Sequence, residues 1–447
     1  MLSRNTFALI LAGGNGTRLG DLTRSQCKPA LPFGAHFRNI DFTLSNCVNS
    51  DVRRIGVLTQ YKAQSLISHL ADGWSFLARP LGEFVEILPA QQRLHSAWYS
   101  GTADAVYQNL DLLRAQRPIY TLVLAGDHIY KMDYRELLDR HAESGAAVTV
   151  GCLPVPIRDA SGFGVLRTDA GGRVCSFLEK PRPETLLEFG AGRHSVLASM
   201  GIYVFNTDYL IESLTRDAAL EHSAHDFGRD LLPAAVSEGC VAAYAFVDST
   251  GQARYWRDVG TVEAYWGAHM ELLADPPRID LFDSTWPIMT SRASLPPARL
   301  LGNRERSGNV SNSLLAGGVV VKGATVRNCV LSSDVRIDEA TLIEESVVLP
   351  GARIGAHCKL QRVVIDAGMR VPDGTVVDAM RSDDVRVTLL SGCYSKEADE
   401  LACGESTHRR RVCAEAAPSA HARQRLVYGT ADSRSSSIDS PHTAQLI

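Results

Sequence analysis

Apolar runs and amphipathic segments alternate over about the first 265 residues of the chain. The runs FALILA (7–12), RRIGVLTQ (53–60) and IYTLVLAGD (119–127) are mostly apolar and rich in branched side chains, as in strands covered on both faces of a sheet. Between them, ADAVYQNLDLLRAQ (103–116) repeats its apolar residues at helical spacing. This alternation predicts an α/β domain with a doubly wound, mainly parallel sheet.

A six-residue period replaces this alternation after about residue 306. Branched aliphatic residues recur every six positions, and glycines and short valine runs fill the gaps. The series are Ile337, Ile343 and Leu349, then Ile354 and Leu360, then Ile365, Val371 and Val377. This period predicts a parallel β-helix, in which each six-residue segment forms one face of a coil. A small β-sandwich with irregular turns is the alternative.

Two stretches lack both periods and mark the limits of the domains. Residues 270–305 are rich in proline, which predicts a linker between an N-terminal domain (1–269) and a β-helix (306–382). Residues 383–447 are polar and contain few apolar side chains, so we expect a disordered tail.

Composition and charge restrict the setting in which the protein works. A formal net charge of −4 gives no general basic field and disfavours nucleic acid as a partner. The ten cysteines include no CxxC pair, which argues against zinc or a disulfide framework and suits a reducing compartment. No window reaches the roughly 18 apolar residues of a membrane-spanning helix, and the first apolar run is too short for a signal peptide. We therefore expect a cytoplasmic protein with no membrane partner.

The segment LILAGGNGTRL (9–19) is a predicted strand that runs into a glycine-rich loop, a common phosphate-binding arrangement. A kinase-type P-loop requires GxxxxGK[ST], and no lysine follows these glycines at that spacing. A dinucleotide fingerprint requires a third glycine where this chain has Leu19. The remaining hypothesis is a loop that holds a nucleoside triphosphate while another group attacks it.

The residues in and after this loop suit a triphosphate. Gly13, Gly14 and Gly16 would let the backbone approach phosphates with its N–H groups pointing inward. Arg18 adds a guanidinium fork for phosphate oxygens, and Lys28 in CKPALP adds a second cation. An ordinary structural turn is the alternative for the glycines alone.

Two aspartates follow or end strand-like runs and could hold a divalent cation. Asp127 ends the run LVLAGD, where packing gives no reason for a carboxylate, and Asp258 lies in YWRDVGT in a similar context. Mg²⁺ is commonly bound through one or two carboxylates together with substrate phosphates. The alternative for Asp127 is a helix N-cap.

The segment FLEKP (177–181) suggests contacts to a second substrate. Lys180 lies between a strand and a proline, where it could clamp a phosphate, and Glu179 could accept hydrogen bonds from sugar hydroxyls. Tyr99 in WYSGTADA could pack on a base or a sugar, although a partly buried structural aromatic residue is equally ordinary. The helix that follows could help to hold an anion at its N-terminus.

The order and spacing of these motifs resemble the glucose-1-phosphate adenylyltransferase family, the bacterial ADP-glucose pyrophosphorylases among the sugar nucleotidyltransferases. The resemblance covers about residues 5–380. It rests on GGxGTRL, KPA, TQY, WYxGTADA, AGDHIYxMDY, FGV, EKP, ASMGIYVF, HDFGxDLLP and YWRDVGTxEAYW. It implies a Rossmann-like nucleotidyltransferase domain of the α/β class with a C-terminal left-handed parallel β-helix.

The resemblance also implies an activity and a role for each site residue. ATP and α-D-glucose 1-phosphate would react with Mg²⁺ present to give ADP-glucose and pyrophosphate in glycogen biosynthesis, on a homotetramer. Arg18, Lys28 and Asp127 would be catalytic. Tyr99, Gly164, Glu179, Lys180 and Ser199 would contact the sugar phosphate; Gly13, Gly14, Gly16 and Gln60 would contact the nucleotide; Asp127 and Asp258 would bind the metal.

The chain departs from the family where regulation is concerned. Ser100, Ser25, Gln26 and Ala367 occupy positions where relatives often carry basic residues, and the family's C-terminal ending is not recognisable. Arg38 is retained. We therefore expect activation by a phosphorylated sugar and inhibition by AMP to be weakened, with catalysis preserved.

Two other functions remain open at this point. One is a sugar-1-phosphate nucleotidyltransferase that uses dTTP or UTP in place of ATP. The other is a catalytically weak regulatory subunit that assembles through the β-helix. Such a subunit would be expected to lack some of the charged residues found here.

Overall fold

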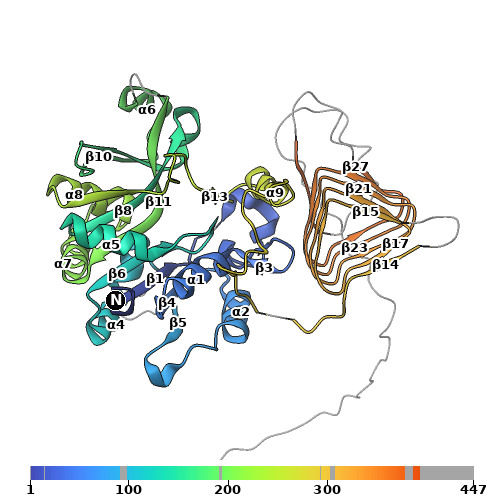
Figure 1. Ribbon diagram of the computed structural model, residues 1–447, viewed down its shortest axis with the longest axis horizontal. Helices are drawn as coiled ribbons and strands as arrows, with labels where there is room; N and C mark the ends of the chain where they lie inside the picture. The colour runs from blue at the N-terminus through green and yellow to red at the C-terminus, as the bar shows by residue number, and fades with distance from the viewer. Residues whose placement is uncertain are drawn as a thin grey trace, which may run out of the picture. The chain divides into compact units, whose positions relative to one another are not determined.

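The computed structural model describes residues 2–14, 16–90, 98–190, 194–291, 293–302, 308–377 and 386–392. It contains an α/β domain and a prism of short stacked strands (Figure 1). Within these residues, no helix is both long enough and apolar enough to cross a membrane.

The α/β domain is built on a nine-stranded sheet with a parallel central part. β1 (Thr6–Leu11) pairs in parallel with β4 (Arg54–Thr59) on one side and with β6 (Tyr120–Ala125) on the other. β5 (Phe84–Pro89) extends this parallel set beyond β4. The carboxyl ends of these strands lie at one edge of the sheet, which is where ligands of open α/β sheets bind.

The other half of the sheet contains antiparallel pairs, because β10 and β11 run opposite to the other seven strands. The sheet is therefore mixed, although most of its strands point one way, as expected. β11 runs antiparallel to β6, β8 and β9, whereas β12 is parallel to β8. A short turn at 169–173 joins β9 to β10 and reverses the chain direction, which an apolar run alone does not encode. The strands of this half are β8 (Val148–Pro156), β9 (Gly164–Thr168), β10 (Val174–Glu179), β11 (Ser195–Asn206) and β12 (Val241–Ala245).

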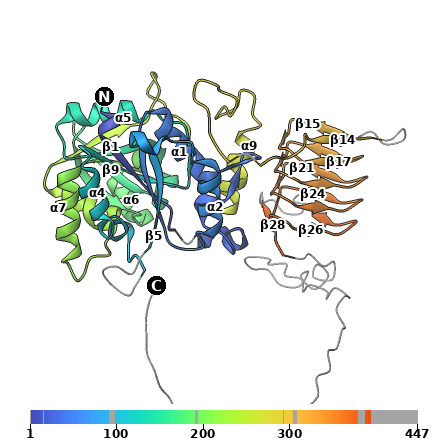
Figure 2. The same ribbon diagram turned by 90° about the horizontal axis from the view of Figure 1, so that it is seen from below.

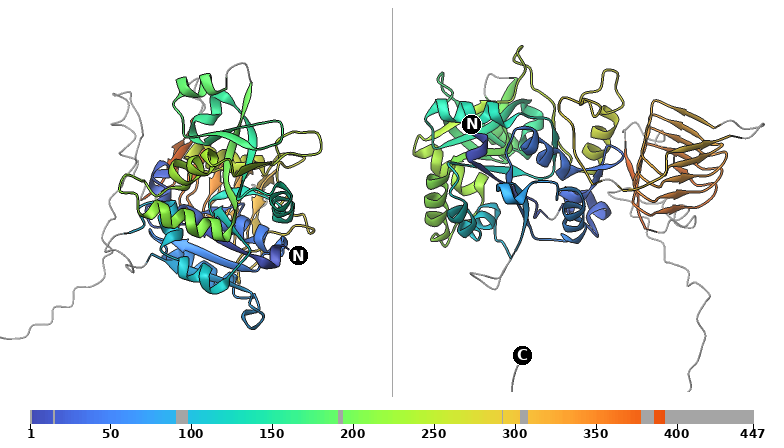
Figure 3. Two further views of the ribbon diagram at one scale, coloured as in Figure 1. Left: turned by 90° about the vertical axis from the view of Figure 1, so that its left-hand side faces the viewer. Right: turned by 60° about the horizontal axis from the view of Figure 1, so that its bottom comes forward.

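Helices cover both faces of this sheet (Figure 3). Along β1, Ala8 and Ile10 pack in a core with α1, α2 and α5, whereas Phe7 and Leu9 pack in a core with α3, α4, α7 and α8. The segment 103–116, expected as one helix, forms α3 and α4 in succession. The helices are α1 (Asn39–Asn49), α2 (Gln64–Gly73), α3 (Thr102–Tyr107), α4 (Leu110–Gln116), α5 (Tyr134–Ser144), α6 (Pro183–Phe189), α7 (Thr207–Ala218), α8 (Leu232–Ser237) and α9 (Val262–Glu271).

Short elements complete the domain. Two small antiparallel ladders join β2 to β3 and β7 to β13. These elements are β2 (Pro32–Phe33), β3 (Phe37–Arg38), β7 (His128–Tyr130) and β13 (Trp256–Asp258), together with the short helices η1 (Ser3–Asn5), η2 (Thr17–Thr23), η3 (Lys28–Ala30), η4 (Arg79–Leu81), η5 (Ile157–Gly162) and η6 (Phe227–Leu231).

The C-terminal strands form three parallel sheets of five strands each, stacked as successive coils (Figure 2). Ile337, Ile354 and Val371 stack in register in one sheet, which confirms the β-helix because a sandwich would require antiparallel pairing. The first sheet holds β14 (Arg299–Leu301), β17 (Val320–Lys322), β20 (Arg336–Ile337), β23 (Arg353–Ile354) and β26 (Arg370–Val371); the second holds β15 (Asn309–Ser311), β18 (Thr325–Arg327), β21 (Leu342–Glu344), β24 (Lys359–Gln361) and β27 (Val376–Val377); the third holds β16 (Leu314–Leu315), β19 (Val330–Leu331), β22 (Val347–Val348), β25 (Val363–Ile365) and β28 (Thr388–Leu390).

The β-helix extends beyond both limits expected from the sequence. β14 falls inside the expected linker 270–305, and β28 lies after residue 382, where it pairs with β25. Both strands lie outside the six-residue series from Ile337 to Val377, so the period did not predict them. Of the expected disordered tail 383–447, only 386–392 lies within the described residues, and the rest of that prediction lies outside them.

The expected linker is also packed rather than free. Ile279 and Ile288 are buried in it. The backbone N–H of Met289 donates to Ser45 Oγ at 2.8 Å, and Thr290 Oγ1 donates to Asp41 Oδ2 at 2.6 Å. These contacts come from single residues that do not recur at a regular spacing, so the sequence pattern does not predict them.

We expect Ile343→Ala to destabilise the β-helix by about 3 kcal/mol, because Ile343 is fully buried in its core and truncation leaves a cavity. Val376→Ala is the matched control, since Val376 lies in the same sheet but is 56% exposed. Urea unfolding followed by circular dichroism measures both. Equal destabilisation by the two substitutions would contradict the assigned core.

Candidate active site

The glycine-rich loop follows β1 and turns into η2. Gly16 has a φ of 58°, and a Cβ there would lie 2.8 Å from Thr23 Cγ2, so the turn needs glycine. A Cβ on Gly13 would lie 3.2 Å from Cβ of Gln60, the residue after β4, whereas one on Gly14 would meet no atom of the described residues within 4 Å. Gly13 thus permits close packing against Gln60, and Gly14 faces open space.

A buried lysine joins two aspartates beyond this loop. The Lys28 side chain is 8% exposed, and its Nζ lies 2.9 Å from Asp127 Oδ2 and 2.5 Å from Asp258 Oδ1. Asp127 lies between β6 and β7, and Asp258 ends β13 opposite His128 of β7. The antiparallel pairing of β7 with β13 therefore brings together two carboxylates that are far apart in the sequence.

The electrostatics of this cluster favour its charged form. Burial alone would raise the pKa of Asp127, but the Lys28 ammonium lowers that pKa to about 2. Burial would likewise lower the pKa of Lys28, but the carboxylates of Asp127 and Asp258 outweigh it and raise that pKa. At neutral pH the Asp127 carboxylate and the Lys28 ammonium are both ionised.

Arg18 stands at the edge of the cluster. Its Nη2 lies 3.8 Å from Asp258 Oδ2, and its side chain is 64% exposed. A Cβ on Gly260 would approach that same Nη2 to 2.9 Å, so glycine leaves room for the guanidinium. Such a long contact holds Arg18 weakly and leaves its donors available to a ligand. The structure thus brings together Arg18, Lys28, Asp127 and Asp258.

The chemistry of this cluster fits a magnesium ion. Among the described residues, no group of three or more histidine, cysteine, aspartate or glutamate side chains could hold a metal ion. Two carboxylates are a suitable protein contribution for Mg²⁺, which keeps several water ligands and takes others from substrate phosphates. Asp127 and Asp258 are the residues here that would hold such an ion.

Glu179 and Lys180 lie on the other half of the sheet, at the end of β10. Gly164 on β9 pairs with Glu179, and a Cβ on Gly164 would lie 2.7 Å from Glu179 Oε2. Lys180 has a φ of 44°, and its exposed Nζ lies 2.9 Å from Glu179 Oε1. Gly164 thus makes space for the glutamate, and Lys180 presents an ammonium group to solvent.

Ser199 lies where β11 bulges. The register of β11 with β8 shifts between Ser199 and Ile202, and Gly201 there has a φ of 67°. Ser199 Oγ accepts a bond from the Gly201 N–H at 3.3 Å, and a Cβ on Gly201 would lie 3.5 Å from His128 Cε1. At the bulge, the backbone that bonds to Ser199 thus lies near His128, the residue after Asp127.

Tyr99 and Ser100 have structural contacts of their own. The Tyr99 hydroxyl accepts from Asn109 Nδ2 at 3.2 Å, and the ring packs against the core on one face of the sheet. Ser100 donates from Oγ and from its N–H to Asp104 Oδ2 at 3.0 and 2.9 Å. These bonds secure the first turn of α3.

His128 is a neighbour of the cluster that the sequence reasoning missed. Its Nε2 lies 3.6 Å from Asp127 Oδ1, and its ring meets the Trp256 ring at a centroid distance of 4.7 Å. Burial lowers the pKa of His128, so the imidazole is neutral at pH 7. The signal was its position directly after Asp127.

A cavity of about 570 Å³ borders the cluster through one residue only. Asp258 lines it together with Phe163, Tyr255, Trp256 and Arg278, whereas Arg18, Lys28 and Asp127 are not part of its lining. The charged cluster is therefore defined by its contacts rather than by this cavity.

The chain matches the family described as "Nucleotidyl transferase" over residues 7–275 and the family described as "GlmU-like, C-terminal hexapeptide" over residues 296–391. A glucose-1-phosphate adenylyltransferase from Methylobacillus flagellatus is 53% identical over 379 residues, covering 83% of this chain and 88% of that protein. Proteins of the same name from Hydrogenovibrio crunogenus and Methylococcus capsulatus are each 49% identical, covering 84% and 86% of this chain and 89% and 90% of their own lengths.

We expect Lys28→Met to raise the pKa of Asp127 and to destabilise the fold by roughly 3 kcal/mol at pH 7, because it leaves two close carboxylates without their cation. With its lowered pKa, Asp127 stabilises the native chain fully above pH 3.8, and that stabilisation is lost as the pH falls to about 2. NMR titration of ¹³C-labelled aspartate and urea unfolding measure the two effects.

Lys131→Met is the matched control for Lys28→Met. It removes a partly buried ion pair with Asp283, at 3.2 Å, that does not involve Asp127. The control should leave the titration of Asp127 unchanged. An Asp127 that titrates alike in both variants and the wild type would contradict the role given to Lys28.

Proposed function

The chain belongs to the nucleotidyl transferase family, and we propose that it is a glucose-1-phosphate adenylyltransferase acting in glycogen biosynthesis. It would transfer the adenylyl group of ATP to α-D-glucose 1-phosphate and release pyrophosphate. The observation that carries this proposal is the cluster of Arg18, Lys28, Asp127 and Asp258 at the carboxyl ends of β1 and β6. The relatives named above support the choice of substrates.

The reaction needs charge control more than it needs a general base. A phosphate oxygen of glucose 1-phosphate attacks the α-phosphorus of ATP and forms a new P–O bond. The bond from that phosphorus to the bridging oxygen breaks, and pyrophosphate leaves with the electron pair. Because the attacking oxygen is already anionic, catalysis consists mainly of alignment and of neutralising the charge on the leaving group.

The residues around β1 would bind the nucleotide. The backbone at Gly13, Gly14 and Gly16 would approach the triphosphate, and the exposed guanidinium of Arg18 would bind its oxygens. Gln60, which packs against Gly13, would lie beside the adenine. Lys28 would hold the two aspartates together and add positive charge next to the triphosphate.

Asp127 and Asp258 would hold Mg²⁺ in this proposal. When bound, the ion would neutralise charge on the triphosphate and on the departing pyrophosphate. The lowered pKa of Asp127 supports this role, because the carboxylate is ready to bind a cation at any physiological pH.

The second substrate would lie over the other half of the sheet. The exposed Lys180 ammonium would bind the phosphate of glucose 1-phosphate, and Glu179 would accept bonds from sugar hydroxyls. Gly164 would keep the space that Glu179 occupies, and Ser199 and Tyr99 would add polar contacts.

The proposal extends to assembly, location and regulation. It includes a homotetramer in the cytoplasm; the seven cysteines in the described residues are all free thiols, as suits a reducing compartment. Regulation by phosphorylated sugars and AMP would be weakened. Ser25, Gln26 and Ala367 offer no cationic side chain to an anionic effector, although the half-buried Arg38 remains.

We expect Lys180→Ala to raise KM for glucose 1-phosphate with little change in kcat, because Lys180 would bind the incoming phosphate before and during reaction. Asp127→Ala should mainly lower kcat, about a hundredfold for a loss of roughly 3 kcal/mol. Steady-state kinetics measure both, with Lys322→Ala on the β-helix as the control for removal of an exposed lysine. Exchanged effects on KM and kcat would contradict the assigned roles.

We expect ATP to be the preferred nucleotide by a large margin in kcat/KM over UTP and dTTP. A pyrophosphate-release assay with glucose 1-phosphate and each nucleotide in turn measures this preference. Preference for UTP or dTTP would reassign the enzyme within the nucleotidyl transferases. Slow turnover alone, with strong stimulation of a partner chain, would indicate a regulatory subunit.

A further inference from the structure

Helix α1 is buried although many of its residues are polar. Asn39, Thr43 and Asn46, together with Ser50 at its C-terminal cap, are each 0% exposed. Buried polar groups are costly unless they form hydrogen bonds, so the partners of these four side chains indicate what they do.

The four residues form one stripe along the helix. Their spacing of four, three and four positions places successive members one turn apart on the same face. Every member contacts main-chain atoms of another segment. Asn39 Nδ2 donates to the Lys28 carbonyl at 3.0 Å, and Thr43 Oγ1 donates to the Ala125 carbonyl at 3.0 Å.

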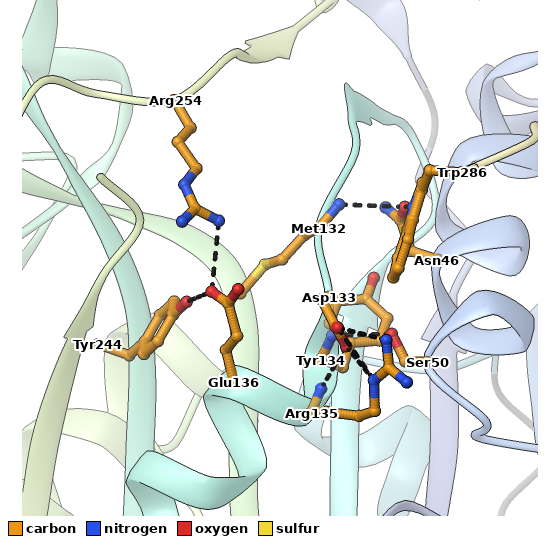
Figure 4. Close-up of polar contacts among 10 residues, drawn as sticks. All are labelled: Asn46, Ser50, Met132, Asp133, Tyr134, Arg135, Glu136, Tyr244, Arg254 and Trp286. Carbon is orange, nitrogen blue, oxygen red and sulfur yellow. Dashed lines mark hydrogen bonds and ion pairs between the residues drawn. The ribbon is translucent and has the colours of Figure 1, made fainter. Parts of the chain in front are cut away.

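The stripe continues along the segment that follows Asp127. Asn46 Nδ2 donates to the Tyr130 carbonyl at 3.1 Å, and its Oδ1 accepts from the Met132 N–H at 3.1 Å. Ser50 Oγ accepts from the Tyr134 N–H at 2.8 Å. Figure 4 shows Asn46 and Ser50 bonded to this segment, with Trp286 also donating to Asn46.

These bonds hold the chain on both sides of Asp127. Ala125 is the last residue of β6, and the pairing of β6 with β11 ends one residue earlier, at Leu124 and Ile202. The carbonyl of Ala125 therefore receives the Thr43 hydroxyl where the antiparallel ladder has stopped. Beyond Asp127, Asn46 fixes the end of β7, which pairs with the strand that bears Asp258.

We propose that the stripe of Asn39, Thr43, Asn46 and Ser50 positions Lys28 and Asp127 by clamping the main chain at Lys28 and on either side of Asp127 to one helix. These are positioning residues, because their bonds go to the main chain of the protein and they would act through Lys28 and Asp127. The inference rests on the proposed function for the roles of Lys28 and Asp127. Residues that orient metal ligands typically change metal affinity or activity by 10-fold to 100-fold when replaced.

Another polar face of α1 provides a matched control. Ser45 is also 0% exposed, but its hydroxyl accepts from the Met289 N–H at 2.8 Å, in the segment between the domains. Ser45→Ala therefore removes a buried hydroxyl from the same helix without loosening the chain around Asp127.

The first test is Thr43→Val, which keeps the shape of the side chain and removes its donor. We expect the dissociation constant for Mn²⁺, measured by electron paramagnetic resonance without substrates, to rise about tenfold. With ATP and glucose 1-phosphate, the half-saturating Mg²⁺ concentration should rise and kcat should fall about tenfold, while KM for glucose 1-phosphate stays unchanged.

Two further variants decide the interpretation. Thr43→Ser restores the donor and should bring the Mn²⁺ dissociation constant and kcat back to within about twofold of wild type. Ser45→Ala should keep wild-type Mn²⁺ affinity and kcat, whatever its effect on Tm. Equal losses in Thr43→Val and Ser45→Ala, or no recovery in Thr43→Ser, would overturn the proposal.

Asn39→Leu covers the case in which Thr43→Val does not fold. Asn39 Oδ1 has no hydrogen-bond partner among the described residues, so leucine of similar shape removes one bond to the Lys28 carbonyl and also a buried oxygen without a partner there. The variant should keep its Tm and show a several-fold higher KM for ATP. Wild-type kinetics would overturn the link from α1 to Lys28.

The Mn²⁺ measurement also separates the two proposals. If the wild-type chain failed to make ADP-glucose yet Thr43→Val still weakened Mn²⁺ binding, the proposed function would fail and the clamp would stand. If the wild type were active and Thr43→Val bound Mn²⁺ normally, only the clamp would fail.

Discussion

The structure depends on one ammonium group held between two carboxylates away from bulk water. Burying an ion is costly, and it is tolerated only when opposite charge and hydrogen bonds meet it at close range. Lys28 satisfies that condition with contacts of 2.9 and 2.5 Å to Asp127 and Asp258. The segments that carry these three residues must therefore be held in fixed positions relative to one another. Much of the α/β domain contributes to holding them there.

The domain fixes them through backbone pairing and through one helix. The β7–β13 ladder aligns the two aspartates, the short helix η3 presents the lysine, and the side chains of α1 bond to the main chain around both. In the first loop, Gly14 faces open space with respect to the described residues. A site of fixed charges beside an open loop suits a reaction in which two anionic phosphates must approach each other.

Much of this could be predicted from the sequence, because it depends on local patterns. The six-residue period predicted the β-helix, and the strand-end positions of the glycines and Asp127 predicted a site at one edge of the sheet. The direction of each strand in the sheet could not be predicted, because an apolar run has the same hydrophobic pattern in a parallel and in an antiparallel strand. The ion pairs of Lys28 were also missed, since they arise from a ladder between two three-residue strands far apart in the chain.

The stripe on α1 shows a different limit of prediction from the sequence. Its residues stand in the sequence as ordinary polar positions in the segment NIDFTLSNCVNS, where polar side chains usually indicate a solvated face. Only the burial of all four, with main-chain partners for each, identifies them as internal contacts. The packing of the segment 270–305 could not be predicted for a similar reason, because the residues that make its contacts do not recur at a regular spacing.

The most direct measurement is a crystal structure of the protein with Mg²⁺ and α,β-methylene-ATP, an analogue that cannot release pyrophosphate. The account predicts a metal ion bound to carboxylate oxygens of both Asp127 and Asp258, with the triphosphate lying along the glycine loop within reach of Arg18. A metal ion bound elsewhere, or a triphosphate remote from that loop, would contradict it.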